Sequence, residues 1–284
     1  MNNFSPYKDF TERMRLLVSK HPTLITTTLS NIFTMRLIGN KTHGDLAEIA
    51  ITEFINQYMY DFRSVHVGKD LYRAKSQEED ITITNEMTKA EFPVSLKAYG
   101  DGPLQLSTDK TSSMFQRLQR EGREEITAAN KLKALFADPA FSAFTTINVL
   151  PLIYDEKKQR CNILVFDSMR ARSETARITL KPAGQGKRKY PVYRFYDSDG
   201  DYICEVRYGA VAANALQRGL WTHTKNGLKY FDSITGGWID YSHNKVLVAL
   251  FSHALVSSEA GHASALEKIK EDIALLKQRS GIEK

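Results

Sequence analysis

The chain has 284 residues, of which 42% are hydrophobic and 25% charged, and 39 Lys and Arg side chains against 33 Asp and Glu give a formal net charge of +6. This length allows one large domain or two modest ones, with a substantial hydrophobic core. The two cysteines, Cys161 and Cys204, are too few for a disulfide framework or a four-cysteine zinc site, which predicts a reducing compartment. Neither a secretory signal pattern nor an apolar run long enough to span a bilayer is present, which predicts a soluble cytoplasmic protein with no membrane partner.

The hydrophobic pattern predicts a helix, three strands, a helix and two strands, followed by a β-rich region and two helices. A helical lead-in over 1–43 is expected to precede a helix over about 44–60. Strands are then expected at 66–72, 80–84 and 92–99, a helix at 111–136, and strands at 145–154 and 161–166. The remaining predictions are strands at 176–181, 190–196 and 202–208, a short helix at 210–218, a hairpin-like unit over 221–242, and helices at 243–257 and 263–279.

The positive charge is concentrated in one stretch of the chain. Residues 170–230 hold 12 Lys and Arg against 5 Asp and Glu, which leaves 27 basic and 28 acidic residues elsewhere. Eight aromatic residues lie in the same stretch. Basic side chains interleaved with aromatic ones are typical of a surface that binds nucleic acid, although a twisted sheet with a solvated basic face would show the same composition.

Two predicted strands carry residues that suit phosphodiester chemistry. Asp80 begins the second strand of the meander, and Ser95-Leu96-Lys97 lies on the third, where alternation places Ser95 and Lys97 on one face. An acid and a lysine on antiparallel neighbours can converge on one point, because a hairpin brings such positions side by side. The preceding helix carries Glu48 in a polar stripe.

This order of residues resembles the PD-(D/E)xK nuclease superfamily, and specifically its type II restriction endonucleases. In that family a helix with a glutamate precedes a strand with an acidic residue and a second strand with an acidic-x-Lys tripeptide, and a helix follows. The resemblance covers roughly residues 44–166. It implies that Asp80 is the principal metal ligand, Lys97 the catalytic lysine and Glu48 the helix acid.

The chain departs from the family pattern at two positions. Glu79 stands where the motif usually has proline, and Ser95 stands where it has a second carboxylate. Some members of the family read Ser-x-Lys and take the missing carboxylate from elsewhere in the chain. Glu48 is therefore the expected second metal ligand, with Glu79 and Glu91 as the next candidates.

The resemblance implies an α/β fold, in which a mixed α+β sheet is flanked by helices and a basic β-rich recognition region follows. The expected parts of this one integrated domain are a helical lead-in at 1–43, a nuclease core at 44–168, a DNA-recognition region at 169–242 and C-terminal helices at 243–284.

The expected cofactor is Mg²⁺, as one or two ions per active site held by Asp80 and Glu48. Lys97 would lower the pKa of the attacking water or orient it, and Ser95 could hydrogen-bond a metal-bound water. The histidines show no HxxxH or HExxH pair, and the chain has no GxxxxGK[ST], GxSxG or strand-linked GxGxxG motif. Zinc hydrolase, P-loop, esterase and dinucleotide-binding functions therefore lack their usual motifs.

The candidate DNA-binding residues form two groups. The polar loop after Lys97 and the start of the next helix suit backbone phosphates, although a plain capped loop would have the same composition. The basic stretch supplies Arg, Asn and Gln side chains that can read base edges in the major groove. The candidates are Gln105, Thr108, Lys110, Ser112, Arg172, Lys187, Arg194, Arg207, Asn214, Gln217, Arg218 and His223.

The sequence thus predicts a type II restriction endonuclease that hydrolyses double-stranded DNA at specific sites and leaves 5′-phosphate and 3′-hydroxyl ends. A homodimer is expected, because one active site per chain must cut two strands of a palindromic target. The resemblance also implies a bacterial source and a cognate methyltransferase as genetic companion. One alternative is a repair or structure-specific nuclease of the same superfamily, and another is a non-catalytic DNA-binding protein, which the serine at position 95 favours.

Overall fold

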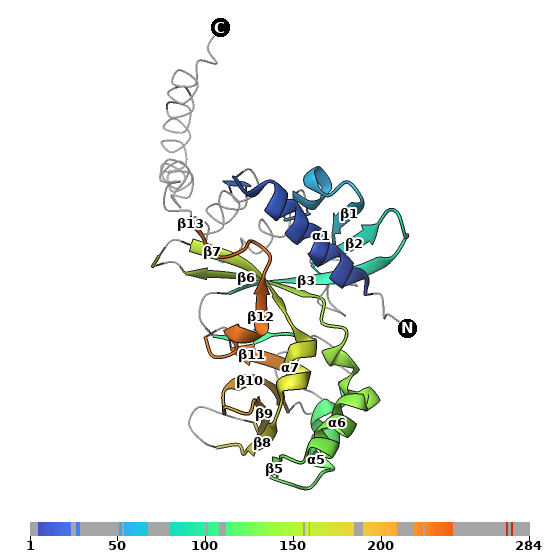
Figure 1. Cartoon of the computed structure of the whole chain (residues 1–284), viewed down its shortest axis with the longest axis vertical. Coiled ribbons are helices and arrows are strands. Elements are labelled where there is room, and N and C mark those ends of the chain that lie inside the picture. Colours follow the sequence, from blue (N-terminus) through green and yellow to red (C-terminus); the bar gives the residue numbers. More distant parts are fainter. Residues whose placement is uncertain are drawn as a thin grey trace, which may run out of the picture.

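The computed structural model describes residues 5–23, 27–28, 51–52, 54–67, 80–99, 102–107, 112–155, 157–158, 160–184, 190–208, 218–223, 225–240, 271 and 274. Its strands form two sheets with a few helices packed around them, so the predicted α/β class with a mixed sheet is confirmed (Figure 1). None of the helices in these ranges is long and apolar enough to cross a membrane.

The first sheet is mixed and has the strand order β1-β2-β3-β6-β7-β12, with β13 also pairing with β7. The first three strands form an antiparallel meander, and β6 then pairs with β3 in parallel. These strands are β1 (Phe62–His66), β2 (Ile81–Asn85), β3 (Glu91–Tyr99), β6 (Val149–Asp155), β7 (Arg160–Phe166), β12 (Phe231–Ser233) and β13 (Ile239–Asp240).

Helix α1 (Pro6–Lys20) covers one face of the first sheet. The Ser5 side chain caps its N-terminus and Pro6 stands in its first turn, where a missing N–H has no consequence. Its buried face packs against apolar side chains of β1 to β3, and the centres of the Phe10 and Phe92 rings lie 6.1 Å apart. The Tyr7 hydroxyl donates a 2.7 Å hydrogen bond to the Val149 carbonyl of β6, which joins the helix to the middle of the sheet.

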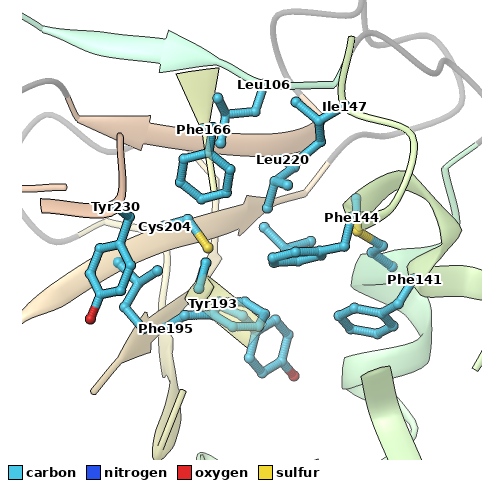
Figure 2. Close-up of a cluster of buried hydrophobic side chains, with 14 of the residues drawn as sticks. Leu106, Phe141, Phe144, Ile147, Phe166, Tyr193, Phe195, Cys204, Leu220 and Tyr230 are labelled. Carbon is cyan, nitrogen blue, oxygen red and sulfur yellow. The ribbon is translucent and has the colours of Figure 1, made fainter. Parts of the chain in front are cut away.

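The second sheet is antiparallel throughout and has the strand order β4-β11-β10-β9-β8-β5. One face packs on short helices and forms the aromatic cluster shown in Figure 2, in which the ring centres of Phe144 and Phe195 lie 5.8 Å apart. The elements are β4 (Pro103–Gln105), α5 (Met114–Gln119), β5 (Glu125–Ile126), α6 (Ala129–Ala137), η1 (Pro139–Phe144), α7 (Ser168–Glu174), β8 (Arg177–Lys181), β9 (Val192–Tyr196), β10 (Tyr202–Arg207), β11 (Gly219–His223) and η3 (Leu228–Tyr230).

The chain passes four times between the two sheets within the described residues. The passages run from β3 to β4, from β5 to β6, from β7 to β8 and from β11 to β12. Each sheet therefore takes strands from both sides of residue 168, so the predicted boundaries of a nuclease core and a recognition region do not coincide with the sheets. The region expected to be a nuclease core supplies β4 and β5 to the second sheet.

Two of the predicted elements are wrong. The helix expected at 111–136 is two helices, α5 and α6, separated by β5. Helix α5 ends at Gln119, and Gly122 in the turn that follows has a φ of +63°, a conformation that favours glycine. Glu125 then pairs with Thr179 of β8. The hairpin-like unit expected at 221–242 is also absent, because β11 pairs in the second sheet and β12 in the first.

Most of the other predicted strands match the structure to within a few residues. The strand expected at 66–72 overlaps β1 only at His66, and 68–79 lie outside the described residues. Cys161 and Cys204 are both free and buried, and burial raises the pKa of each thiol. The helix expected at 243–257 lies outside the described residues. Only Arg218 of the helix expected at 210–218, and only Glu271 and Ala274 of the helix expected at 263–279, are described.

Gly227 stands where the second sheet leaves no room for a side chain. A Cβ atom at this position would lie 2.7 Å from the Ile203 carbonyl oxygen, which already accepts a hydrogen bond from the Thr222 hydroxyl. Gly227→Ala is therefore expected to destabilise the fold by about 1 to 3 kcal/mol, the usual cost of overpacking a buried site. Urea unfolding measures this loss. The neighbouring Asn226→Ala, at an exposed position, should change stability by less than about 0.5 kcal/mol, and equal midpoints for the two variants would contradict the packing argument.

Candidate functional site

Asp80 is held at the start of β2 by groups of the neighbouring strand β3. Its Oδ2 accepts a hydrogen bond of 2.8 Å from the Ser95 hydroxyl and one of 2.6 Å from the Leu96 backbone N–H. The Lys97 ammonium nitrogen lies 4.0 Å from the same oxygen. The structure thus brings together three of the four residues predicted to be catalytic.

The pleat of the sheet explains why these side chains meet. The register pairs Ile81 with Val94, so Asp80 continues the ladder opposite Ser95. On both strands, apolar residues alternate with Asp80, Ser95 and Lys97. These apolar side chains face the core under α1, where Val94 is fully buried. The acid, the hydroxyl and the lysine therefore share the face of the sheet opposite α1.

The site is partly open to solvent. The side chains of Asp80 and Lys97 are 19% and 20% exposed, whereas Ser95 is buried. Within the described residues all the contacts of the Asp80 carboxylate fall on Oδ2, so Oδ1 remains for another ligand. Glu48, the predicted second carboxylate, lies outside the described residues.

The donor set fits a magnesium ion in part. In the described ranges no three His, Cys, Asp or Glu side chains gather as a metal site. Mg²⁺ is usually held by only one or two carboxylates and keeps several waters, with phosphate oxygens completing its shell. One carboxylate with a free oxygen beside a lysine is therefore a sufficient start for Mg²⁺, whereas Zn²⁺ would need more protein ligands.

The second sheet carries a polar face on the side away from the aromatic cluster. We call it the arginine face and define it by three arginines stacked on aromatic rings together with the glutamate between two of them. The guanidinium carbons lie 3.8, 5.9 and 5.0 Å from the centres of their rings. The pairs are Arg207 on Trp221, Arg194 on Tyr202 and Arg177 on Tyr196, and the glutamate is Glu205.

Glu205 lies between two of these arginines and is 3% exposed. Arg194 Nε donates to its Oε2 at 3.1 Å, and Arg207 Nε donates to its Oε1 at 2.9 Å. Burial alone would lower the pKa of Arg194, but the Glu205 charge and the interactions with Tyr196 and Glu205 together outweigh burial, so the pKa is raised and the guanidinium stays charged. Both arginines are partly exposed, with 30% and 23% of their side chains accessible.

Four predicted DNA contacts belong to this sheet. Arg194 and Arg207 lie on the arginine face, and Gln105 is the register partner of Trp221. The His223 ring meets the edge of Tyr202, with centroids 5.5 Å apart. Burial lowers the pKa of His223, which favours the neutral imidazole. Arg218 precedes β11, and its carbonyl accepts a hydrogen bond from the Trp221 indole at 3.4 Å.

The other predicted contacts are not part of this group. Arg172 lies on α7, where it donates to the Phe136 carbonyl at 2.7 Å and lines a cleft of about 1000 Å³ between α6 and α7. Ser112 lies just before α5. The remaining candidates, Thr108, Lys110, Lys187, Asn214 and Gln217, lie outside the described residues.

The sequence places Tyr202 and Trp221 among the eight aromatic residues of the basic stretch, but it did not single out Glu205 or predict that these three side chains share one face. The reason is a β-bulge between Tyr202 and Cys204, which brings Tyr202 to the same face as Glu205. Strict alternation from Tyr202 would put these two side chains on opposite faces. The position of Glu205 between Arg194 and Arg207 depends on the strand register, which the sequence alone does not show.

No protein-family model, curated protein or solved structure matched this chain when the three comparisons were made. The arrangement of its own residues is therefore what bears on its function.

Proposed function

We propose that this chain is a Mg²⁺-dependent, type II-like endonuclease of the PD-(D/E)xK superfamily that cuts double-stranded DNA at specific sequences. The observation that carries the proposal is the contact of Asp80 with Ser95, the Leu96 N–H and Lys97 across the β2–β3 hairpin. An acid and a lysine that share one partly open point on a sheet suit phosphodiester hydrolysis. Ser95 adds a hydroxyl where the family motif has a carboxylate.

The topology of the first sheet supports the same proposal. Three antiparallel strands are followed by helices and then by β6, which pairs with β3 in parallel. This order agrees with what the resemblance implies, in which the acid and the lysine lie on consecutive strands and a helix follows. The parallel partner places β3 inside the sheet, where neighbouring strands hold the backbone of Ser95 and Lys97 on both sides.

Each side chain has a distinct role in the proposed reaction. Asp80 would hold the metal through Oδ1, while the hydrogen bonds to Oδ2 fix the direction of the carboxylate. Mg²⁺, when bound, supplies charge that stabilises the phosphoryl oxygens and activates water. Lys97 would orient the attacking water and offset the negative charge that develops on the scissile phosphate. Glu48 is the proposed second carboxylate.

Plasmid digestion tests the proposed function directly. The purified full-length chain is incubated with a plasmid of known sequence in Mg²⁺, with EDTA and with Ca²⁺ in parallel reactions. We expect discrete fragments in Mg²⁺ and none in EDTA, and we expect ends that a DNA ligase joins without further phosphorylation. Sedimentation of the same protein tests the expected homodimer.

Other results would favour the alternatives. A smear, or nicks confined to branched or mismatched DNA, would indicate a repair or structure-specific nuclease. Binding of DNA without cleavage in Mg²⁺ or Mn²⁺ would indicate a non-catalytic DNA-binding protein.

A further inference from the structure

On the arginine face, one buried glutamate, Glu205, pairs with two partly exposed arginines, Arg194 and Arg207. Glu205 is buried, and burying a carboxylate is costly unless its oxygens are satisfied. Here each oxygen takes one Nε–H, from Arg194 and from Arg207, and neither arginine is fully buried. The carboxylate therefore fixes the orientation of two partly exposed guanidinium groups on adjacent strands.

We propose that Arg194 and Arg207, positioned by Glu205, bind guanine bases in the major groove of double-stranded DNA. The inference rests on the proposed function, since it names the bases that the same enzyme would recognise. Each guanidinium uses Nε for Glu205, and its terminal Nη groups form the fork that matches O6 and N7 of guanine.

The charge of this group favours a base over a phosphate as the ligand. Two arginines and one glutamate carry a net charge of only +1, so Glu205 cancels half of the attraction that the arginines would offer a phosphate. Binding to backbone phosphates depends on net positive charge and counterion release. Hydrogen bonds to the edge of a neutral base depend on direction instead, and a buried carboxylate that holds both side chains supplies that direction.

The aromatic rings restrict the arginines further. The Arg207 guanidinium carbon lies 3.8 Å from the centre of the Trp221 ring, within the range of a stacked cation–π contact. Trp221 is itself buried and lies opposite Glu205 in the β10–β11 register, so the ring and the carboxylate hold the side chain together. A side chain that is already ordered loses less conformational entropy when it binds a base.

Arg177 on the same face provides a matched comparison. It stacks on Tyr196 and contacts Glu125 at 3.6 Å, but its side chain is 42% exposed and makes no contact with Glu205. It has the charge and the aromatic support of the other two arginines without the shared carboxylate. Its contribution to DNA binding is therefore expected to be electrostatic.

Selection of binding sites in the absence of cleavage tests the proposal. The full-length chain, in Ca²⁺, is mixed with duplexes that contain a random central segment, and the bound duplexes are sequenced. We expect a consensus with guanine at fixed positions. Arg194→Lys and Arg207→Lys keep the charge but lose the fork, so each should relax one guanine position, with a loss of roughly 10- to 100-fold in preference.

Glu205→Gln should relax both guanine positions, because both arginines lose their support, and Glu205→Asp should restore part of the preference. Because Glu205→Gln removes a negative charge, this variant should bind unrelated DNA more strongly and with a steeper salt dependence. Arg177→Lys should leave the consensus unchanged. Thermal unfolding of each variant confirms that it is folded at the assay temperature.

A second measurement uses the unaltered protein and so does not depend on how the variants fold. Replacing a consensus guanine by 7-deazaguanine removes N7, and binding should fall by roughly 10-fold if an arginine contacts that atom. Equal affinity for both duplexes, a consensus without guanine, an unchanged consensus in the arginine variants, or the absence of DNA binding would each overturn the proposal.

The outcomes separate this proposal from the proposed function. A chain that selects guanine-containing sites but never cuts DNA would fail the digestion test and still support the role of the arginines. A chain that cuts at discrete sites while the lysine variants keep the same consensus would retain its function, and the proposal for Arg194 and Arg207 would be wrong.

Discussion

Lys97→Ala is expected to slow plasmid cleavage by about 10²- to 10⁴-fold, whereas binding to the same DNA should change little. The reason is the position of the Lys97 ammonium, 4.0 Å from Asp80 Oδ2 on the polar face of β3. A cation at this point acts mainly on charge that develops during the reaction, so its removal affects kcat rather than affinity. Asp80→Asn should cause a loss of similar size, because the amide would hold Mg²⁺ weakly.

Single-turnover cleavage and DNA binding in Ca²⁺ measure the two effects separately. Ser95→Ala should reduce cleavage by only about 10-fold, since it removes one hydrogen bond to a carboxylate that the Leu96 N–H also holds. Lys133→Ala is the matched control, because Lys133 is exposed on α6, on the opposite side of the second sheet from the arginine face. Cleavage by Lys97→Ala at the rate of Lys133→Ala would show that the proposed site is wrong.

Asp197→Asn is expected to lower stability at neutral pH by about 2 kcal/mol and to reduce the sensitivity of the fold to acid. Asp197 follows β9, and its Oδ1 accepts backbone hydrogen bonds from Asp199 and Asp201 at 3.1 and 2.8 Å. Its Oδ2 accepts the Tyr230 hydroxyl at 2.7 Å and the Lys229 ammonium. The carboxylate thus joins the β9–β10 turn to η3, which leads into the first sheet.

The direction of the pH effect follows from the pKa of Asp197. Burial by itself raises this pKa, but the hydrogen bonds from Lys229, Tyr230 and the Asp201 backbone outweigh burial and lower it from 3.8 to about 2. A carboxyl with a lowered pKa in the folded state stabilises the fold fully above the unfolded pKa. That stabilisation is lost as the pH falls through the window from about 4 to 2.

Thermal unfolding at several pH values between neutrality and 2 tests this prediction. The wild-type melting temperature should fall more steeply below about pH 4 than that of Asp197→Asn. Asp199→Asn is the matched control, because Asp199 is exposed in the same turn and should leave both stability and pH dependence nearly unchanged. Parallel curves for wild type and Asp197→Asn would contradict the argument.

Local patterns predicted the strands of the candidate active site well. The alternation in Ile81–Asn85 and the apolar positions of Glu91–Tyr99 gave both strands to within a residue, and period two placed Ser95 and Lys97 on one face. The pairing of Asp80 with Ser95 then follows from a simple hairpin register. The sequence sufficed here because adjacent strands pair with each other and no bulge intervenes.

The second sheet could not be predicted in the same way. Its neighbours β4 and β11 are far apart in the chain, and β5 is a two-residue strand inside a segment with helical periodicity. The pairing of Glu125 with Thr179 outweighs that helical preference, which is a tertiary effect that no local window contains. The contacts of Glu205 likewise depend on register and on the bulge after Tyr202.

The four passages of the chain between the two sheets limit how such a protein can acquire a new target. A specificity domain attached at one end of an enzyme can be exchanged in a single recombination event. Here a continuous block that contained all of the second sheet would also carry β6 and β7 of the first. Under the proposed function, specificity would therefore evolve by individual substitutions, and a chimaera made by transplanting the segment from β8 to β11 would lack the two edge strands that complete its sheet.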